Sequence, residues 1–272
     1  MEIIMPENSH LTTSGLPKGS DQFVEAFARG LSVIKAFGPN HQFLTLSEVA
    51  QRTGLTAAGA RRLLYTLITL EYARVDNRKF SLTPAVLELG YAYLAALPLC
   101  DLARVAVDEY MEKTGEICTV SVIDRNEIVY VARAEMPSPL SRRLGVGERL
   151  PAHATSSGQV LLASMGSDSL DAYLAQAPFE RFTKFTIIEA TPLKKAINQA
   201  GKQGYALANQ QLELGICGLA VPIRDDRNKI VAALTTSLNL ARHEHESILE
   251  KFLPIMQQTA KNISRGLGHQ LT

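Results

Sequence analysis

The segment 151–159, Pro-Ala-His-Ala-Thr-Ser-Ser-Gly-Gln, concentrates polar groups that could bind an organic acid. It supplies an imidazole, three hydroxyls and the expected start of a helix, whose first N–H groups lack partners within the helix. With Thr155 or Ser156 as the cap, such N–H groups form a natural carboxylate site. Arg133, at the end of a predicted strand, is a second candidate, because a guanidinium binds a carboxylate through two parallel hydrogen bonds.

Other residues could complete this candidate site as an apolar pocket with a few polar groups. Leu144, Gly145 and Val146 precede the segment and could form an apolar wall, while Thr235 and Ser237 could add hydroxyls from the last predicted strand. Two candidates have an equally good structural explanation. His153 could be a structural histidine bonded to the backbone, and Arg133 could form an ion pair at the surface or in a dimer.

The same residues do not fit an enzyme. Ser156 or Ser157 beside His153 is a possible nucleophile by residue type, but the chain has no Gly-x-Ser-x-Gly elbow and no evident carboxylate to orient the imidazole. The run 243–246, His-Glu-His-Glu, lacks the His-Glu-x-x-His spacing of a zinc site. Phosphate-binding and dinucleotide-binding glycine motifs are absent, and the three cysteines are widely spaced. We therefore predict no catalytic residue, no metal and no cofactor.

A second group of residues has types and spacing suited to nucleic acid. In a helix predicted from residue 57 onward, small residues and then arginines and hydroxyls fall on one outer face, opposite an apolar face. Small residues allow close approach to a groove, and arginines reach bases and phosphates. The predicted DNA contacts on and before this helix are Thr56, Ala57, Ala58, Arg61, Arg62, Tyr65 and Thr66.

The elements around this helix are typical of a winged helix-turn-helix. Amphipathic helices are predicted over 22–37 and 45–52, the second with Thr45 and Glu48 as a capping box, and a Gly54 turn precedes the third helix. Two short alternating runs then flank a turn expected at Asp76-Asn77, which predicts a β-hairpin. This hairpin would act as the wing, with Arg74, Arg78 and Lys79 on phosphates of the adjacent groove.

The charge distribution agrees with this placement. The whole chain carries a net charge of +1, whereas residues 21–85 hold eight basic and five acidic side chains. No stretch reaches the ~20 apolar residues of a membrane span, and the start of the chain lacks the pattern of a secretory signal. Hydrophobic residues make up 46% of the chain and charged residues 20%, which are ordinary values for a globular fold. We expect a cytoplasmic protein.

The predicted organisation has four parts. Residues 1–20 form a polar, disordered leader, 21–83 the winged helix-turn-helix, 84–97 a linker helix that begins at Pro84, and 98–272 a second domain. Within that domain, strand pairs over 117–124 and 127–135, and over 215–225 and 229–239, alternate with helices. This pattern predicts an α+β fold with a central antiparallel sheet covered by helices.

Five motifs together resemble the isocitrate lyase regulator (IclR) family, in the order found there. They are QFVEAFARGLSVIKAF, SEVAQRTGLTAAGARRLLYTL, YARVDNRKFSLTPAVLELGYAYL, RLPAHATSSGQVLLA and ELGICGLAVPI, and the likeness spans about residues 22–267. The runs VARAE, LGVGERLPAHATSSG and GYALANQQLELG are similar to the branch that controls protocatechuate and p-hydroxybenzoate catabolism.

The resemblance implies a transcription regulator that binds an operator in double-stranded DNA as a dimer or tetramer, with RNA polymerase as a further partner if it is an activator. It also implies a GAF-like effector-binding domain for an aromatic acid, or alternatively a non-aromatic oxo- or hydroxy-acid. A non-catalytic interaction protein that uses the winged helix for protein contacts is the alternative from another class. The resemblance also implies that the effector site includes Ala154, Gln211, Cys217 and Gly218. The chain departs from many relatives at three of these positions, Gln211, Cys217 and Gly218.

Overall fold

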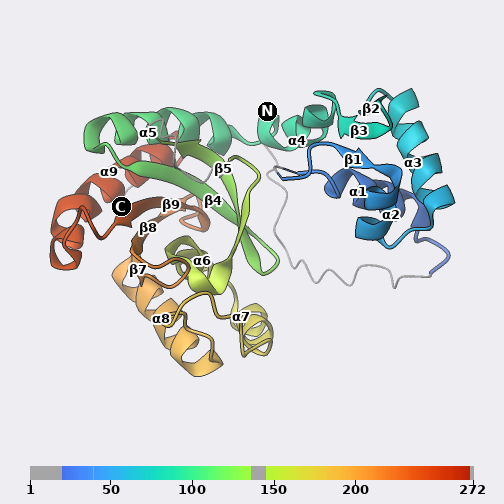
Figure 1. Cartoon of the computed structure of the whole chain (residues 1–272). Coiled ribbons are helices and arrows are strands. Elements are labelled where there is room, and N and C mark those ends of the chain that lie inside the picture. The colour runs from blue at the N-terminus through green and yellow to red at the C-terminus, as the bar shows by residue number, and fades with distance from the viewer. Residues whose placement is uncertain (1–19, 39, 136–144, 270–272) are drawn as a thin grey trace. The chain divides into compact units, whose positions relative to one another are not determined.

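The computed structural model describes residues 20–38, 40–135 and 145–269, which fall into two compact units that divide between Tyr93 and Leu94 (Figure 1). The predicted wall residue Leu144 and, apart from Ser20, the predicted leader lie outside the described residues. Each unit has its own core, so each is described by itself.

The N-terminal unit packs three helices against a small antiparallel sheet of order β1-β3-β2. Val33, Leu64 and Phe80, from the first helix, the third helix and the hairpin, meet in its core. The unit comprises α1 (Glu25–Lys35), β1 (Leu44–Thr45), α2 (Leu46–Thr53), α3 (Ala57–Thr69), β2 (Ala73–Asp76), β3 (Lys79–Leu82) and most of α4 (Val86–Ala95).

Local side-chain signals set the ends of these helices, as the sequence predicts. The Thr45 hydroxyl accepts a hydrogen bond from the Glu48 N–H, and the Glu48 carboxylate accepts one from the Thr45 N–H, which completes the capping box. These hydrogen bonds lower the pKa of Glu48. Gly54 ends α2 in the left-handed conformation at φ 67°, and Thr56 caps α3. The Gly54 turn therefore fixes how α3 leaves α2.

The hairpin turn differs by one residue from the predicted Asp76-Asn77 position. Asp76 pairs with Lys79, so the two turn residues are Asn77 and Arg78, with φ values of 47° and 64°. A two-residue turn that matches the strand twist needs positive φ at both central positions. Asn accepts this conformation readily, whereas Arg78 adopts it at a steric cost. The turn places the Arg78 side chain at the exposed tip of the hairpin.

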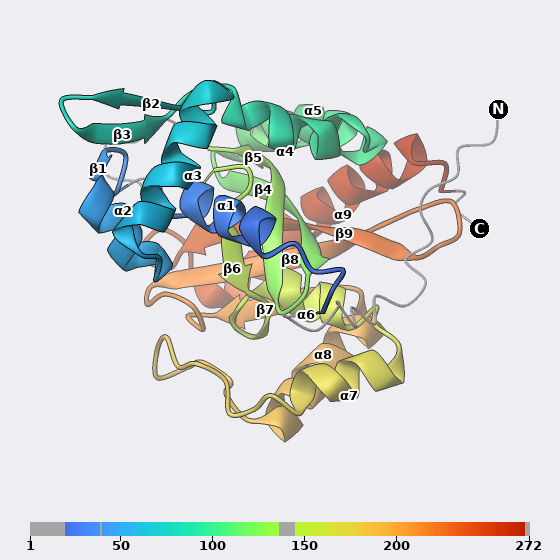
Figure 2. The ribbon, with the colours of Figure 1, turned by 90° about the vertical axis from the view of Figure 1, so that its right-hand side faces the viewer.

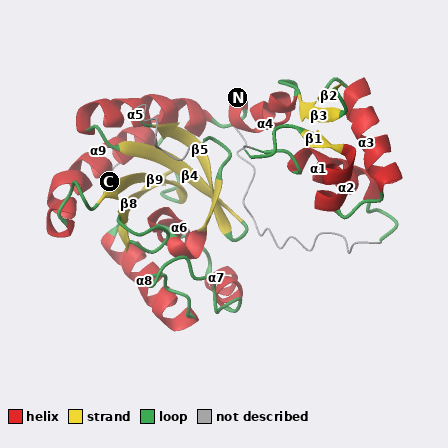
Figure 3. Ribbon diagram, viewed as in Figure 1, coloured by secondary structure: helices red, strands yellow, loops and turns green. Residues whose placement is uncertain are grey.

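The C-terminal unit is built on one antiparallel sheet of six strands in the order β6-β5-β4-β9-β8-β7 (Figure 3). The strands are β4 (Ile117–Asp124), β5 (Glu127–Ala134), β6 (Arg149–Pro151), β7 (Ala206–Asn209), β8 (Ile216–Arg224) and β9 (Ile230–Asn239). The helical segments are α5 (Pro98–Thr114), η1 (Ala152–Ala154), α6 (Ser156–Leu162), α7 (Ser167–Leu174), α8 (Ala190–Gln203), η2 (His245–Ser247) and α9 (Ile248–Gly266).

The two faces of this sheet carry side chains of different size. α5 and α9 cover one face, and α6, α7 and α8 lie on the other (Figures 1 and 2). Leu219, Leu234 and Ile223 fill the α5–α9 face. Towards α6 the central and β7-side strands present small residues, such as Ala220 and Ala233. These small side chains allow α6 to approach the sheet closely, as at Gly218, where an added Cβ would lie 2.8 Å from the Ser156 hydroxyl.

β6 and β7 are absent from the strands that the sequence predicts. Both are short, with three and four residues, and both lie at an edge of the sheet. An edge strand is held by one neighbour only, so its own sequence pattern carries a weak signal. The predicted strands over 117–124, 127–135, 215–225 and 229–239 correspond to β4, β5, β8 and β9.

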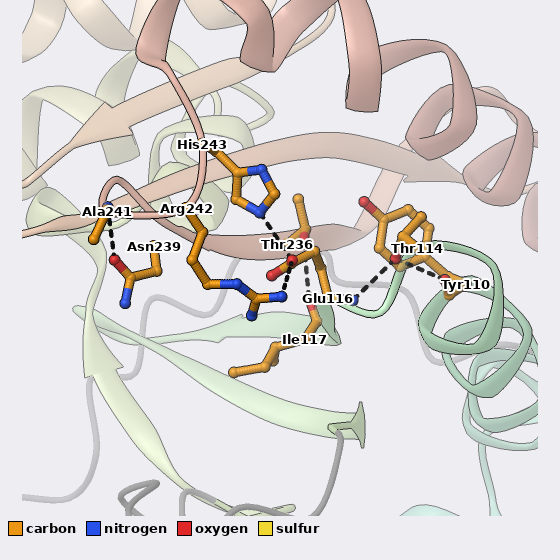
Figure 4. A network of polar contacts seen from close by, with 9 residues as sticks. All are labelled: Tyr110, Thr114, Glu116, Ile117, Thr236, Asn239, Ala241, Arg242 and His243. Atoms are coloured by element: carbon orange, nitrogen blue, oxygen red, sulfur yellow. Dashed lines mark hydrogen bonds and ion pairs between the residues drawn. The ribbon is translucent and has the colours of Figure 1, made fainter.

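A buried polar network joins the start of β4 to the connection between β9 and α9 (Figure 4). The Glu116 carboxylate accepts a hydrogen bond from His243 Nε2 at 2.8 Å and lies 3.6 Å from Arg242 Nη2. Only 7% of the Glu116 side chain and 11% of the His243 side chain are exposed. The His243 ring also meets Phe252 of α9 edge-on at 5.1 Å. The network therefore fixes α9 relative to the sheet.

Among the described residues, no single helix is both long and apolar enough to cross a membrane. α4 and α5 pass such a test only as a pair, by length and composition, and the chain bends sharply at the break between them. α5 buries Leu99, Ala103 and Val107 in the core of the C-terminal unit.

Candidate DNA-binding and effector sites

The outer face of α3 is exposed along its length. Leu64 and Leu67 point into the core, while Arg61 and Arg62 project outward, and the Arg61 guanidinium lies 5.6 Å from the centre of the Tyr65 ring. All ten residues predicted to contact DNA are exposed: Thr56, Ala57, Ala58, Arg61, Arg62, Tyr65, Thr66, Arg74, Arg78 and Lys79. This arrangement can present cations and hydroxyls to a groove.

The hairpin β2–β3 is fixed directly beside this helix. The Tyr65 ring meets the Phe80 ring edge-on, with 6.5 Å between the ring centres. Arg74 Nε donates a hydrogen bond to the Ser81 hydroxyl at 3.2 Å, which orients the guanidinium along the hairpin. α3 and the hairpin therefore form one continuous cationic surface.

Arg52, on α2, is a candidate DNA contact that the sequence analysis did not include. Its Nη2 donates a hydrogen bond to His41 Nε2 at 2.8 Å, and the residue is exposed. The first helix of a helix-turn-helix crosses the DNA backbone, which makes a basic residue at its end a phosphate candidate. That position relative to α3 was a signal available in the sequence.

Five residues on the α6 side of the sheet form what we call the polar patch: Thr119, Ser121, Arg133, Thr235 and Ser237. Arg133 on β5 lies opposite Thr119 on β4, which lies opposite Thr235 on β9. This row of three crosses adjacent strands, although its members are far apart in sequence.

The cation of the polar patch is buried and only partly paired. The Arg133 side chain is 9% exposed, its Nη2 donates to the Glu135 carboxylate at 2.6 Å, and its Nε has no partner among the described residues. The guanidinium also lies 5.8 Å from the centre of the Tyr130 ring. A buried donor without a partner is costly, which makes Arg133 a candidate partner for an anion.

Two hydroxyls of the polar patch also lack partners. Ser121 is fully buried, Thr235 is 7% exposed, and neither side-chain oxygen has a hydrogen bond within the described structure. Ser121 was missed by sequence reasoning, although a serine between valines on a buried strand was a visible signal. Arg133, Thr235 and Ser237, which were predicted, share this face with it.

The start of α6 packs tightly on the neighbouring part of this face. A side chain on Gly158 would meet the Ala152 carbonyl, and a Cβ on Gly218 would lie 2.8 Å from the Ser156 hydroxyl. The Thr155 hydroxyl caps the helix by accepting from the Gly158 N–H. The predicted residues Ala154, Thr155, Ser156 and Gly218 are thus gathered here, and Gln211 joins them through a 3.2 Å hydrogen bond from Gln159.

His153 has the structural role that the sequence left open. Its Nε2–H donates to the Glu180 carbonyl at 2.9 Å, and its ring stacks on Phe179 with 4.9 Å between ring centres. Burial lowers the pKa of the imidazole, which favours the neutral form. His153 therefore anchors the connection between α7 and α8.

Two predictions for the effector site need correction. Cys217 lies in the core between the sheet and α5 and α9, because neighbouring strand residues face opposite sides and Gly218 faces α6. Burial raises the pKa of the Cys217 thiol to about 11. The apolar wall is also not formed by its described members: Gly145 and Val146 are exposed in the turn closed by the hydrogen bond from the Glu148 N–H to the Gly145 carbonyl.

Both units match models of known protein families. The model of the IclR helix-turn-helix domain matches residues 26–77, and that of the bacterial transcriptional regulator IclR C-terminal matches residues 91–265. The Pca regulon regulatory protein of Pseudomonas putida is 38% identical over 254 residues, which cover 93% of this chain and 86% of that protein.

Two further relatives are connected with a hydroxybenzoate, one by its name and one by the ligand in its crystal structure. The p-hydroxybenzoate hydroxylase transcriptional activator of Acinetobacter baylyi is 30% identical, over 90% of this chain and 92% of that protein. The crystal structure of an IclR homolog from Microbacterium hydrocarbonoxydans, complexed with 4-hydroxybenzoate, is 26% identical with a TM-score of 0.78. That comparison covers 89% of this chain and 98% of the other.

Proposed function

Because the chain belongs to the IclR family of bacterial transcription regulators, we propose that a small aromatic acid controls how it binds its operator. The acid would be of the p-hydroxybenzoate or protocatechuate kind, since relatives regulate the Pca regulon and p-hydroxybenzoate hydroxylase. The protein would act in the cytoplasm, without catalysis, on genes for the breakdown of such acids.

The N-terminal unit would bind the DNA. α3 would enter a major groove with Arg61 and Arg62 towards bases and phosphates, and the hairpin cations would bind phosphates beside it. Arg52 would add a phosphate contact from α2. Arginine contacts to guanine contribute sequence preference, whereas the phosphate contacts contribute salt-dependent affinity.

The observation that carries the effector part is the polar patch. A buried arginine whose Nε lacks a partner, beside two hydroxyls that lack partners, is expensive unless a ligand satisfies them. A carboxylate meets the need of Arg133, because charge-assisted hydrogen bonds are the stronger kind. Beside the patch this face carries small side chains, such as Ala220 and Ala233.

The protein would act as a dimer, the smallest assembly that matches a two-fold operator. Its apolar surface supports this: α4 buries none of its residues, and Leu87 and Tyr91 are 75% and 69% exposed. On α1, Phe27 and Leu31 lie on one exposed side, four residues apart. Such apolar surface is typical of an interface. Substitution of Leu87 and Tyr91 by Glu should convert dimers to monomers in analytical ultracentrifugation, while Glu at exposed Val105 of α5 should not.

The test of the function is operator binding by the full chain, measured by fluorescence anisotropy on DNA from upstream of its own gene and of neighbouring catabolic genes. 4-Hydroxybenzoate or protocatechuate should change the affinity for one such fragment, or raise the thermal stability of the protein. A loss of affinity on adding the acid would indicate a repressor, and a gain an activator that also contacts RNA polymerase. Operator binding that no acid alters, with no stabilisation by any acid, would contradict the proposal.

A further inference from the structure

The two hydroxyls of the polar patch that lack partners lie on adjacent strands and can reach one common atom. Ser121 on β4 is opposite Ala233 on β9, two residues from Thr235 on the same face. In an antiparallel pair, such diagonal neighbours are about 7–8 Å apart between Cα atoms, so a group between them can contact both side chains. Neither oxygen is satisfied by the protein within the described structure.

Arg133 lies on one side of this hydroxyl pair. The row Arg133, Thr119, Thr235 crosses two strand spacings, or about 10 Å between the outer Cα atoms. One benzene ring with its substituents can bridge the distance between the side chains at the two ends of this row. A ring whose carboxylate meets Arg133 would therefore direct a substituent on its far side at Ser121 and Thr235.

The charge of the polar patch limits that substituent. The patch holds one positive charge, on Arg133, and Glu135 already offsets part of it from 2.6 Å. A second carboxylate on the ligand would face two neutral hydroxyls with no cation from the patch, and burying an unpaired charge is very unfavourable. A neutral hydroxyl can instead both donate to and accept from Ser121 and Thr235.

We propose that Ser121 and Thr235 together recognise a ring hydroxyl, so that the effector is a singly charged hydroxylated aromatic acid rather than a plain aromatic acid or a dicarboxylate. Ser121 is then a specificity-determining residue. The observation that indicates this role is its hydroxyl, which has no hydrogen-bond partner in the described structure. This inference rests on the proposed function, because it assumes that the patch binds the effector carboxylate. A site built around a ligand hydroxyl disfavours the analogue without it, since its own buried groups would remain unpaired.

The experiment is isothermal titration calorimetry of the full chain with benzoate, 3-hydroxybenzoate, 4-hydroxybenzoate and terephthalate. The wild-type protein should bind one hydroxybenzoate at least tenfold more tightly than benzoate, and terephthalate more weakly than either. In Ser121→Ala and in Thr235→Val the preference over benzoate should fall to about threefold or less. Thr235→Ser, which keeps the hydroxyl, should retain the preference.

A fold defect is separated from recognition by thermal melts without ligand. Ser121→Ala removes a hydroxyl that has no partner, so its melting temperature should be unchanged or higher. If the tenfold preference survives in both variants, or if benzoate binds as tightly as the hydroxybenzoates, this inference is wrong while acid sensing stands. If none of these acids binds the wild-type protein, the effector part of the proposed function fails as well.

Discussion

The guanidinium of Arg133 pairs with a protein carboxylate and, in the proposed effector site, would also pair with the carboxylate of the acid. The Glu135 carboxylate is 2.6 Å from Arg133 Nη2 and is 24% exposed on its side chain, so it competes electrostatically with an incoming acid. At this depth the repulsion between two carboxylates on one guanidinium is only partly screened by water. At the proposed effector site, we therefore expect Glu135 to compete with the acid for Arg133 and to lower the affinity of the patch.

Glu135→Gln should consequently tighten the binding of a hydroxybenzoate, by about three- to tenfold. Removal of the charge relieves the repulsion while the amide can still accept from Arg133. Glu148→Gln, a partly buried carboxylate on the same β5–β6 connection, is the control. Calorimetric titration gives both values, and weaker binding by Glu135→Gln would show that Glu135 serves to hold Arg133 in place.

His153 makes the stability of the C-terminal unit depend on pH. Burial lowers its pKa below the ordinary value of 6.5, so the folded protein favours the neutral imidazole. The stability from this residue is complete above about pH 6.5 and is lost as the pH falls towards the lowered pKa, because the unfolded chain takes up the proton first.

The urea concentration at the unfolding midpoint should therefore decrease as the pH is lowered from 7.5 to 5.5. The decrease should be smaller in His153→Gln than in the wild type. The amide of Gln can still donate to the Glu180 carbonyl but does not titrate. His245→Gln, at an exposed position in η2, is the matched control and should follow the wild-type curve. Parallel curves for His153→Gln and wild type would exclude this role.

At the scale of elements, we expect α3 and the β2–β3 hairpin to make different kinds of contact with DNA. In the proposed complex with DNA, the side chains at the start of α3 would face a groove, while the exposed hairpin cations would contact phosphates. Contacts to base edges distinguish sequences, and contacts to phosphates do not. The two elements should therefore respond differently to mutation.

Lys79→Ala should weaken binding to operator and to unrelated DNA alike, and should reduce the slope of log K against log salt by about 1. Arg61→Ala should cost about 1–3 kcal/mol on the operator and less on unrelated DNA. Arg29→Ala on α1, whose guanidinium is paired with Glu25 at 3.0 Å, is the control. Equal losses on both DNAs for Arg61→Ala would assign that residue to the phosphate backbone.

Elements were also the level at which sequence reasoning succeeded most. The caps at Thr45 and Thr56 and the left-handed residues Gly54 and Gly115 act within one helical turn, so their signals are local and readable. The one-residue error at the wing has a local cause as well. Arg78 adopts a positive φ, and arginine is not a residue type for which this conformation is expected.

At the scale of the whole molecule, the C-terminal unit depends on contacts between distant parts of the chain. The Glu116–His243 pair joins positions 127 residues apart and holds the start of α9 against the sheet (Figure 4). Both partners are nearly buried, so removal of one leaves the other without compensation.

Glu116→Ala should lower the free energy of unfolding by about 1–3 kcal/mol, because it leaves the N–H of the buried His243 without an acceptor. Glu109→Ala on α5 breaks an exposed pair with Lys113 at 3.8 Å and should cost less than about 1 kcal/mol. Urea unfolding of both variants gives the comparison. Similar small losses would mean that water replaces the Glu116 contact.

The sequence by itself determined the helix-turn-helix, its wing and the residues that face outward from them, because i to i+4 spacing and caps decide these locally. It also identified Arg133 and Thr235 as polar groups on strands. Only the tertiary structure decided that they belong to one site: β9 lies between β4 and β8, which brings residues about 100 positions apart into one row. The same strand order put Ser121 into the patch and Cys217 on the far face, since strand pairing, and not sequence distance, sets which side chains share a surface.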